Sequence, residues 1–236
     1  TRPVARAGIA SAAAVPLAIH AGYLGLPVDT VVSTSVGAVL VIALFSGTIF
    51  VRGVSGRPLE SVSLTVFGIL YTGVLLSFAY VLRYHPYAIG QPAGTAVLML
   101  THLLVWISDT GAYVVGRTMG KRKLIPSVSP GKTVAGALGA LVVSAVASWA
   151  LVRFVLVPQA QLGLRPVHAI LFGIAISTAV QLGDLAESLI KREAGVKDSS
   201  HIIPGHGGVL DRIDGMLFAL PVAYWLLNVW LIPAPR

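Results

Sequence analysis

The stretch VHAILFGIAISTAVQLGDLAESLIKR, residues 167–192, begins as a predominantly apolar run and ends in charged side chains. A helix needs roughly 20 mainly apolar residues to cross a bilayer. The run therefore predicts a membrane-spanning helix over residues ~167–190. If this helix continues through GDLAESLIKR, then Asp184, Glu187, Ser188 and Lys191 follow the spacing i, i+3, i+4 and i+7 and share one helix face.

The composition of the whole chain favours the same interpretation. Of its 236 residues, 56% are hydrophobic and 11% are charged, whereas soluble domains have about 25% charged residues. The mean hydropathy is +0.84. We therefore predict an all-α, polytopic integral membrane protein that forms a single helical membrane domain over residues 1–236. About seven spans are expected, over residues ~4–24, ~29–51, ~62–82, ~93–116, ~133–157, ~167–190 and ~214–232.

The first apolar run follows Arg2 and Arg6 and resembles a signal peptide, but no small-residue cleavage site leads into a soluble domain. We interpret it as a first span. Because the chain starts at Thr1 rather than Met, an N-terminal part is expected to precede it, and seven spans is a lower bound. The absence of cysteine excludes disulfides and thiolate metal sites.

Positively charged residues gather in alternate loops, which is the signal that orients membrane proteins. The fourth and sixth loops carry most of them and are predicted to face the cytoplasm, in a cell (inner) membrane. The net charge of +8 is then mainly a topology signal, with attraction to anionic lipid headgroups as a second effect. Nucleic-acid binding is not expected, because the positive charge is divided among separate loops.

Acidic residues within spans are candidates for function, since a charged side chain at mid-bilayer costs roughly 2.5 to 3.5 kcal/mol on insertion scales and needs a partner. Asp184 is one such residue and Asp109, in the fourth span, is another. For Asp109 two readings stay open: a buried side chain that braces helices, or a contact with substrate or metal. For Glu187 the alternative to function is a surface pair with Lys191, worth about 0.2 to 0.5 kcal/mol.

The loop after the sixth span reads KDSSHIIPGHGGVLDRIDG, residues 197–215. Its glycines allow backbone amides near His206 to approach an anionic ligand. Asp211 and Asp214 follow at i and i+3, so with Asp184 three carboxylates are expected to converge at one membrane face. Oxygen ligands of this kind suit Mg²⁺, with or without a second cation. The alternative is an ion-pair network that holds the loop in place.

Two blocks resemble a known family. The order S-x-I-K-R, four residues, K-D-x-S-x-x-I-P-x-H-G-G-V-x-D-R-I-D, from Ser188 to Asp214, resembles the signature of the phosphatidate cytidylyltransferases, also called CDP-diacylglycerol synthases. SDTGAYVVGRTMGKRKLIPSVSPGKTVAGALG, residues 108–139, is similar to that family's S-D-x-x-A-Y-x-x-G and S-P-x-K-T segments. The resemblance covers roughly residues 93–232, the expected catalytic portion. One departure is Ala135, where the family commonly has Glu, and we leave that position out of the site.

The resemblance implies transfer of CMP from CTP to phosphatidate, giving CDP-diacylglycerol and pyrophosphate at the cytoplasmic face. It implies three metal ligands: Asp184, Asp211 and Asp214. The residues assigned to the chemistry and its phosphates are Lys191, Arg192, Lys197 and Arg212, with Asp198 orienting Lys197 or a metal-bound water and His206 positioning the nucleotide. The residues assigned to substrate binding are Asp109, Ser129, Lys132, Ser188, Gly207 and Gly208. The expected partners are CTP, phosphatidate, membrane lipids and, as a homodimer, a second copy of the chain.

Two alternatives remain at this point. The first is CMP transfer to another lipid phosphate, such as a polyprenyl or ether lipid, because acyl-chain selection leaves no motif. The second is an ion-coupled secondary transporter, which would also place Asp109 and Asp184 in spans. A transporter has no need of a glycine-rich loop crowded with acids and bases, so the enzyme is favoured.

Overall fold

The computed structural model describes residues 4–26, 30–52, 57–86, 91–200 and 207–233. The chain divides into two compact units, Thr1–Val81 and Leu82–Arg236. The predicted catalytic portion, 93–232, falls within the second unit.

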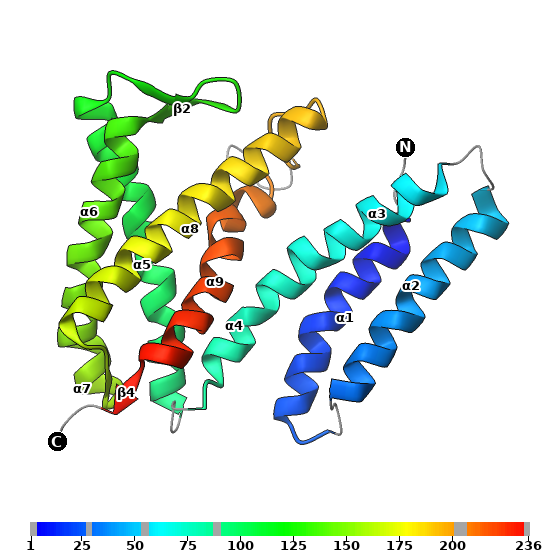
Figure 1. Cartoon of the computed structure of the whole chain (residues 1–236), viewed down its shortest axis with the longest axis horizontal. Coiled ribbons are helices and arrows are strands. Elements are labelled where there is room, and N and C mark those ends of the chain that lie inside the picture. The colour runs from blue at the N-terminus through cyan, green and yellow to red at the C-terminus, as the bar shows by residue number, and fades with distance from the viewer. Residues whose placement is uncertain (1–3, 27–29, 53–56, 87–90, 201–206, 234–236) are drawn as a thin grey trace. The chain divides into compact units, whose positions relative to one another are not determined.

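The first unit is built from helices (Figure 1). They are α1 (Ala5–Tyr23), α2 (Thr30–Arg52), α3 (Pro58–Gly68) and the π-helical turn η2 (Ile69–Val74), after which α4 (Leu75–Arg83) leads into the second unit. A small core forms where Leu44, Val62 and Ile69 are buried. The Val4 amide donates to Thr65 Oγ1 at 2.9 Å, which links the residue before α1 to α3.

Four long helical segments form the second unit (Figure 1). They are α5 (Gln91–Met119), α6 (Val134–Leu151) with its continuation η3 (Val152–Leu156) and α7 (Val157–Ala160), α8 (Pro166–Glu193) and α9 (Leu210–Trp230). Their bounds lie within about four residues of the expected spans. The side chains of Leu104, Phe172 and Leu217, from three of these helices, are fully buried between them.

Two of these helices start where the sequence supplies a suitable residue. Thr133 caps α6, because its hydroxyl accepts a hydrogen bond from the Gly136 amide at 3.1 Å. Pro166 opens α8, where its missing N–H costs nothing. With 28 residues, α8 is about 42 Å long, which exceeds the ~30 Å hydrocarbon core of a bilayer. It is therefore long enough for its charged C-terminal end to extend beyond the apolar region.

Five helices in the described part of the chain are long and apolar enough to cross a membrane: Pro58–Arg83, Pro92–Met119, Val134–Ala160, Pro166–Glu193 and Leu210–Trp230. The prediction of about seven spans is not confirmed. The first expected span is present as α1, which contains Arg6, Pro16 and His20 and is not among these five. The second coincides with α2, in which the apolar helix identified covers only Gly37–Phe50.

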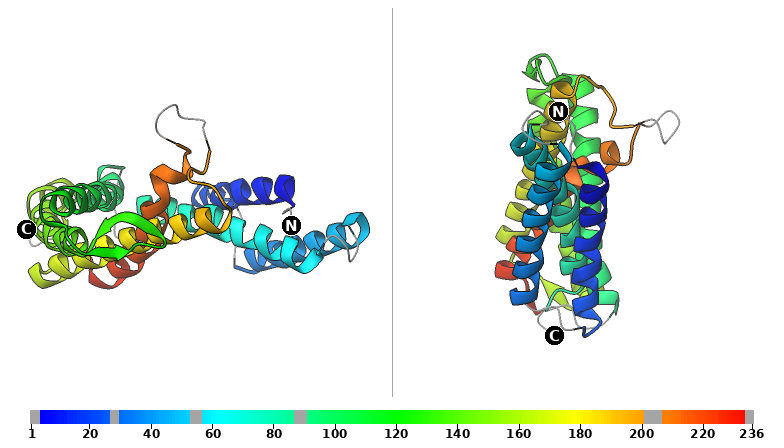
Figure 2. Two further views of the ribbon diagram at one scale, coloured as in Figure 1. Left: turned by 90° about the horizontal axis from the view of Figure 1, so that it is seen from above. Right: turned by 90° about the vertical axis from the view of Figure 1, so that its right-hand side faces the viewer.

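Two small strand pairs close opposite ends of the second unit (Figure 1). At one end, β1 (Lys123–Ile125) and β2 (Ser129–Thr133) form an antiparallel hairpin; at the other, β3 (Leu162–Gly163) pairs with β4 (Ile232–Pro233). In Figure 2 the hairpin lies at the same end as the C-terminal part of α8. The fourth and sixth loops therefore share one side, as predicted, although the sequence did not indicate a hairpin within the fourth loop.

Close packing of α6 on α8 gives a first testable prediction. A Cβ at Gly173 of α8 would collide with the backbone carbonyl oxygen of Ser144 in α6. We therefore expect Gly173→Ala to destabilise the protein by about 1–3 kcal/mol, as overpacking usually does. Gly47→Ala in α2 is the control: nothing lies within 4 Å of its Cβ position, and an added methyl there should be neutral or stabilising by about 0.5–1 kcal/mol. Melting curves in detergent measure both, and a wild-type midpoint for Gly173→Ala would contradict this packing.

Candidate functional site

Close contact between α8 and α9 brings two of the predicted carboxylates together. A Cβ on Gly183 would lie 2.6 Å from the carbonyl oxygen of Asp214, and one on Gly215 would lie 2.9 Å from Val180 Cγ1. Only glycine lets the two backbones approach this closely. Asp184 and Asp214, each next to one of these glycines, therefore lie on neighbouring helices at the same level.

The β1–β2 hairpin positions Lys132 beside this pair. Lys132 Nζ lies 2.7 Å from Asp184 Oδ2 and donates to the Gln181 carbonyl oxygen at 3.4 Å. On the other carboxylate oxygen, Ser188 Oγ donates to Asp184 Oδ1 at 3.4 Å. The two sequence blocks, about 50 residues apart, thus meet at Asp184.

A cavity of about 620 Å³ opens at this end of the second unit. It is bordered by α5, the hairpin, the start of α6 and α8, and it contains three of the predicted site residues, Asp109, Lys132 and Asp184. Its wall also includes Tyr113, Arg117 and Lys123. The cavity therefore presents both anionic and cationic groups at one end of a helix bundle.

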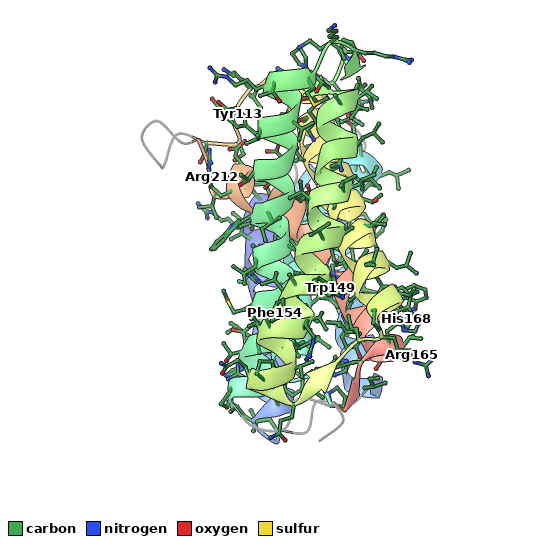
Figure 3. The ribbon with its side chains drawn as sticks, turned by 90° about the vertical axis from the view of Figure 1, so that its left-hand side faces the viewer. Tyr113, Trp149, Phe154, Arg165, His168 and Arg212 are labelled. Carbon is green, nitrogen blue, oxygen red and sulfur yellow. The ribbon has the colours of Figure 1, made fainter. Side chains whose placement is uncertain are left out.

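Arg117 and Tyr113 are cavity residues that the sequence analysis did not assign to the site. Arg117 Nη1 donates to Tyr113 Oη at 2.6 Å, and its guanidinium carbon lies 5.9 Å from the centre of that ring. Figure 3 shows Tyr113 toward the hairpin end of the unit, whereas Arg165 and His168 lie toward the opposite end. The spacing 109, 113, 117 along one helix face was the signal available for them.

Asp109 lies within electrostatic range of Asp184, Asp214 and Lys132. The three carboxylates of Asp109, Asp184 and Asp214 therefore repel one another, and the positive charge of Lys132 partly offsets this repulsion. Bracing of the helices at this level comes from the preceding residue instead, because Ser108 Oγ and Ser177 Oγ form a buried hydrogen bond of 2.8 Å between α5 and α8. Asp109 itself faces the cavity.

A second cluster lies one turn further along α8. Lys191 Nζ is 2.6 Å from Glu187 Oε2 and 2.6 Å from Asp211 Oδ1, so one lysine joins two carboxylates. The Glu187 side chain is 1% exposed, that of Lys191 17% and that of Asp211 9%. The Glu187–Lys191 pair of the alternative is therefore present, but both side chains are enclosed by the packing of α8 on α9 rather than exposed.

Asp211 also binds the segment that precedes α9. Its Oδ2 accepts hydrogen bonds from the Ser199 amide (2.9 Å), from Ser199 Oγ (2.6 Å) and from the Gly208 amide (2.7 Å). Gly207, just before, has φ +77°, a conformation that L side chains rarely adopt. Both oxygens of Asp211 are thus bonded within the protein.

The other predicted residues lie around these clusters rather than in the cavity wall. Arg192 is exposed and its Nε donates to the Val128 carbonyl oxygen at 3.4 Å, which joins α8 to the hairpin that contains Ser129. Lys197 and Arg212 are exposed and Asp198 is half-buried; Arg212 appears on the same side as Tyr113 in Figure 3. His206 lies outside the described residues.

The described residues contain no group of three or more His, Cys, Asp or Glu side chains arranged to hold a metal ion. Asp184 and Asp214 do lie together, with Asp109 in electrostatic range. Asp211, the third expected ligand, is instead bonded to Lys191, Ser199 and Gly208. Magnesium binding stays a prediction. The carboxylate oxygens of Asp109, Asp184 and Asp214 are the kind of ligand that Mg²⁺ prefers.

Fold and site together define a helical membrane protein with a charged cavity at one end of its bundle. The model of the Cytidylyltransferase family matches residues 2–230, and the chain belongs to that family.

Curated relatives carry the name phosphatidate cytidylyltransferase. The relative from Staphylococcus haemolyticus is 43% identical over 159 residues, which are 67% of this chain and 58% of the relative. The Bacillus subtilis relative is 44% identical over 137 residues, 58% of this chain and 49% of the relative. The Haemophilus influenzae relative is 45% identical over 141 residues, 59% and 48% respectively. The chain thus spans about half the length of the relatives that it matches.

Proposed function

We propose that the protein transfers CMP from CTP to phosphatidate. A phosphate oxygen of phosphatidate attacks the α-phosphorus of CTP, the bond from that phosphorus to the bridging oxygen of the β-phosphate breaks, and pyrophosphate leaves. The products are CDP-diacylglycerol and pyrophosphate. No general base is needed, because a phosphate monoester is already ionised near neutral pH.

One observation carries this proposal: a cavity lined by Arg117, Lys123 and Lys132 at one end of the membrane helices of a cytidylyltransferase-family chain. Both substrates are anionic, so their approach needs cationic groups that offset the repulsion and stabilise the leaving group. A site at the end of the helices is accessible to soluble CTP and to a phosphate held at the membrane surface. In this account Lys132, fixed by Asp184, binds a phosphate.

Magnesium belongs to the proposal as a cofactor. Asp184 and Asp214 would hold it, with Asp109 nearby, because these three carboxylates lie within electrostatic range of one another and Lys132 pairs directly with Asp184 alone. When bound, Mg²⁺ would supply positive charge at the phosphates. The protein side chains orient both substrates around it. The predicted homodimer stays a prediction.

The cavity end is proposed to face the cytoplasm in a cell (inner) membrane, and cysteine labelling tests this. The chain has no native cysteine, so any labelling of a single-cysteine variant comes from the introduced residue. We expect cysteines at Ser127 and Ser199 to react with an impermeant maleimide only from the cytoplasmic side, and one at Gln161, at the other end of the second unit, only from outside. Labelling of the first two from outside would reverse the orientation and the route for CTP.

Substrate choice is tested with purified protein, four nucleoside triphosphates and a panel of lipid phosphates. We expect a strong preference for CTP or dCTP over ATP and GTP, and for phosphatidate among the lipids. Equal turnover of all four nucleotides would contradict the proposed activity. A preference for a polyprenyl phosphate or an ether lipid would retain CMP transfer but change the lipid substrate.

A further inference from the structure

Glu187 has no role in the proposed reaction, yet it is the most deeply buried acid of the region. Its side chain is 1% exposed, although it lies near the charged end of α8. Lys191 Nζ lies 2.6 Å from Oε2 without the alignment of a hydrogen bond, and Oε1 has no hydrogen-bond partner among the described residues. A buried carboxylate in this state is costly and needs a reason.

A series of contacts connects Glu187 on α8 to the segment that precedes α9. Lys191, held by Glu187 on its own helix, reaches across to Asp211 Oδ1 on α9. With that oxygen occupied, the other oxygen of Asp211 is turned toward Ser199 and Gly208 and accepts three hydrogen bonds from them. One carboxylate oxygen thus ties together two points that are nine residues apart in the chain.

We infer that Glu187 is a positioning residue, the buried base of a clamp that runs through Lys191 to Asp211 and fixes Ser199 and Gly208. We name this set, Glu187–Lys191–Asp211, the clamp. On one side it sets the positions of Lys197, which is predicted to contact phosphates, and of Asp198, which is predicted to orient Lys197 or a metal-bound water. On the other side it sets the position of Gly207, which is predicted to bind substrate. Lys191 and Asp211 act here within the protein rather than on substrate or cation.

The electrostatics explain why two carboxylates are used for one lysine. With Asp211 alone, the flexible Lys191 side chain can exchange that contact for a passing phosphate. A second, buried carboxylate on the same helix holds the ammonium group beside Asp211, since removing one partner of a buried pair leaves an uncompensated charge. The clamp is read from the structure itself, whereas its effect on turnover rests on the proposed function.

Hydrogen exchange at the Ser199 and Gly208 amides tests the clamp without any substrate. Glu187→Gln keeps the size of the side chain and removes its charge, so we expect both amides to exchange at least 10-fold faster, with exchange in α5 unchanged. Glu193→Gln, an exposed acid two turns further along the same helix, is the matched control and should change neither. Unchanged exchange in Glu187→Gln would overturn the inference, as would equally faster exchange throughout α8 and α9, which indicates a general packing role.

A double-mutant cycle tests whether Glu187 acts through Lys191. We expect Glu187→Gln and Lys191→Met each to speed exchange at Ser199 and Gly208, and the double variant to exchange no faster than Lys191→Met alone. Additive effects would contradict the clamp. In CMP-transfer assays Glu187→Gln should lower kcat/KM by about 10-fold or more. If the wild type transfers no CMP to any lipid phosphate, the proposed function fails while the exchange results still decide the clamp.

Discussion

Replacing Asp184 with Asn is expected to lower kcat/KM for CMP transfer by roughly 10² or more, on the order of 3 kcal/mol at the transition state. Asn has nearly the same shape, so the helices should stay folded. The variant loses the charge that pairs with Lys132 at 2.7 Å and that is proposed to hold Mg²⁺ with Asp214. Both substrates then bind to a site in which Lys132 is displaced and Mg²⁺ is held more weakly.

The measurement for Asp184→Asn is activity against Mg²⁺ concentration, with a melting curve in detergent. Partial recovery at high Mg²⁺ is expected, because a weaker site fills at higher concentration. An exposed structural pair would instead cost only about 0–1 kcal/mol of stability and no turnover. Near-normal turnover by a folded Asp184→Asn would remove Asp184 from the site, and full activity of the wild type in chelator would remove the metal.

Asp211→Asn should lower kcat/KM for CMP transfer at least as much as Asp184→Asn, for a different reason. Both oxygens of Asp211 accept bonds, from Lys191 on one side and from Ser199 and Gly208 on the other. The amide nitrogen of Asn must face one of these donors and cannot accept from it. We expect kcat/KM to fall by roughly 10² or more and the exchange of the Ser199 and Gly208 amides to accelerate in the same variant.

The dependence of activity on Mg²⁺ concentration distinguishes two roles for Asp211, a residue of the clamp or a cation ligand. As part of the clamp, Asp211→Asn should recover little activity at high Mg²⁺, in contrast to Asp184→Asn. Recovery of both variants to the same extent would make Asp211 a cation ligand, as the sequence predicts, and would contradict its role in the clamp. Circular dichroism of the helices provides the control for folding.

Much of the second unit could be predicted from the sequence. Apolar length alone located α5, α6, α8 and α9, and the family signature brought Asp109, Lys132 and Asp184 into one hypothesis. The β1–β2 hairpin was missed because its strands are three and five residues long and carry no alternating apolar pattern.

The roles of Glu187 and Asp211 could not be predicted because they depend on packing between helices. An i, i+4 acid–lysine pair reads as a surface pair from sequence, since nothing local shows that α9 will cover it. The approach of α9 is permitted by Gly183 and Gly215, whose effect appears only when both backbones are placed. The ion-pair alternative for this loop and the metal hypothesis each describe part of the set: Asp211 lies in the ion-pair network, and Asp184 and Asp214 remain the proposed cation ligands.

The central claim is CMP transfer, and the position of the label in CTP tests it most directly. Purified protein is incubated with phosphatidate and with CTP labelled at either the α- or the γ-phosphate, in Mg²⁺. We predict that the α-label enters the lipid product and that the γ-label leaves as pyrophosphate, in equal amounts. A γ-label in the lipid, or CTP that stays intact while the protein moves ions across vesicles, would contradict the account.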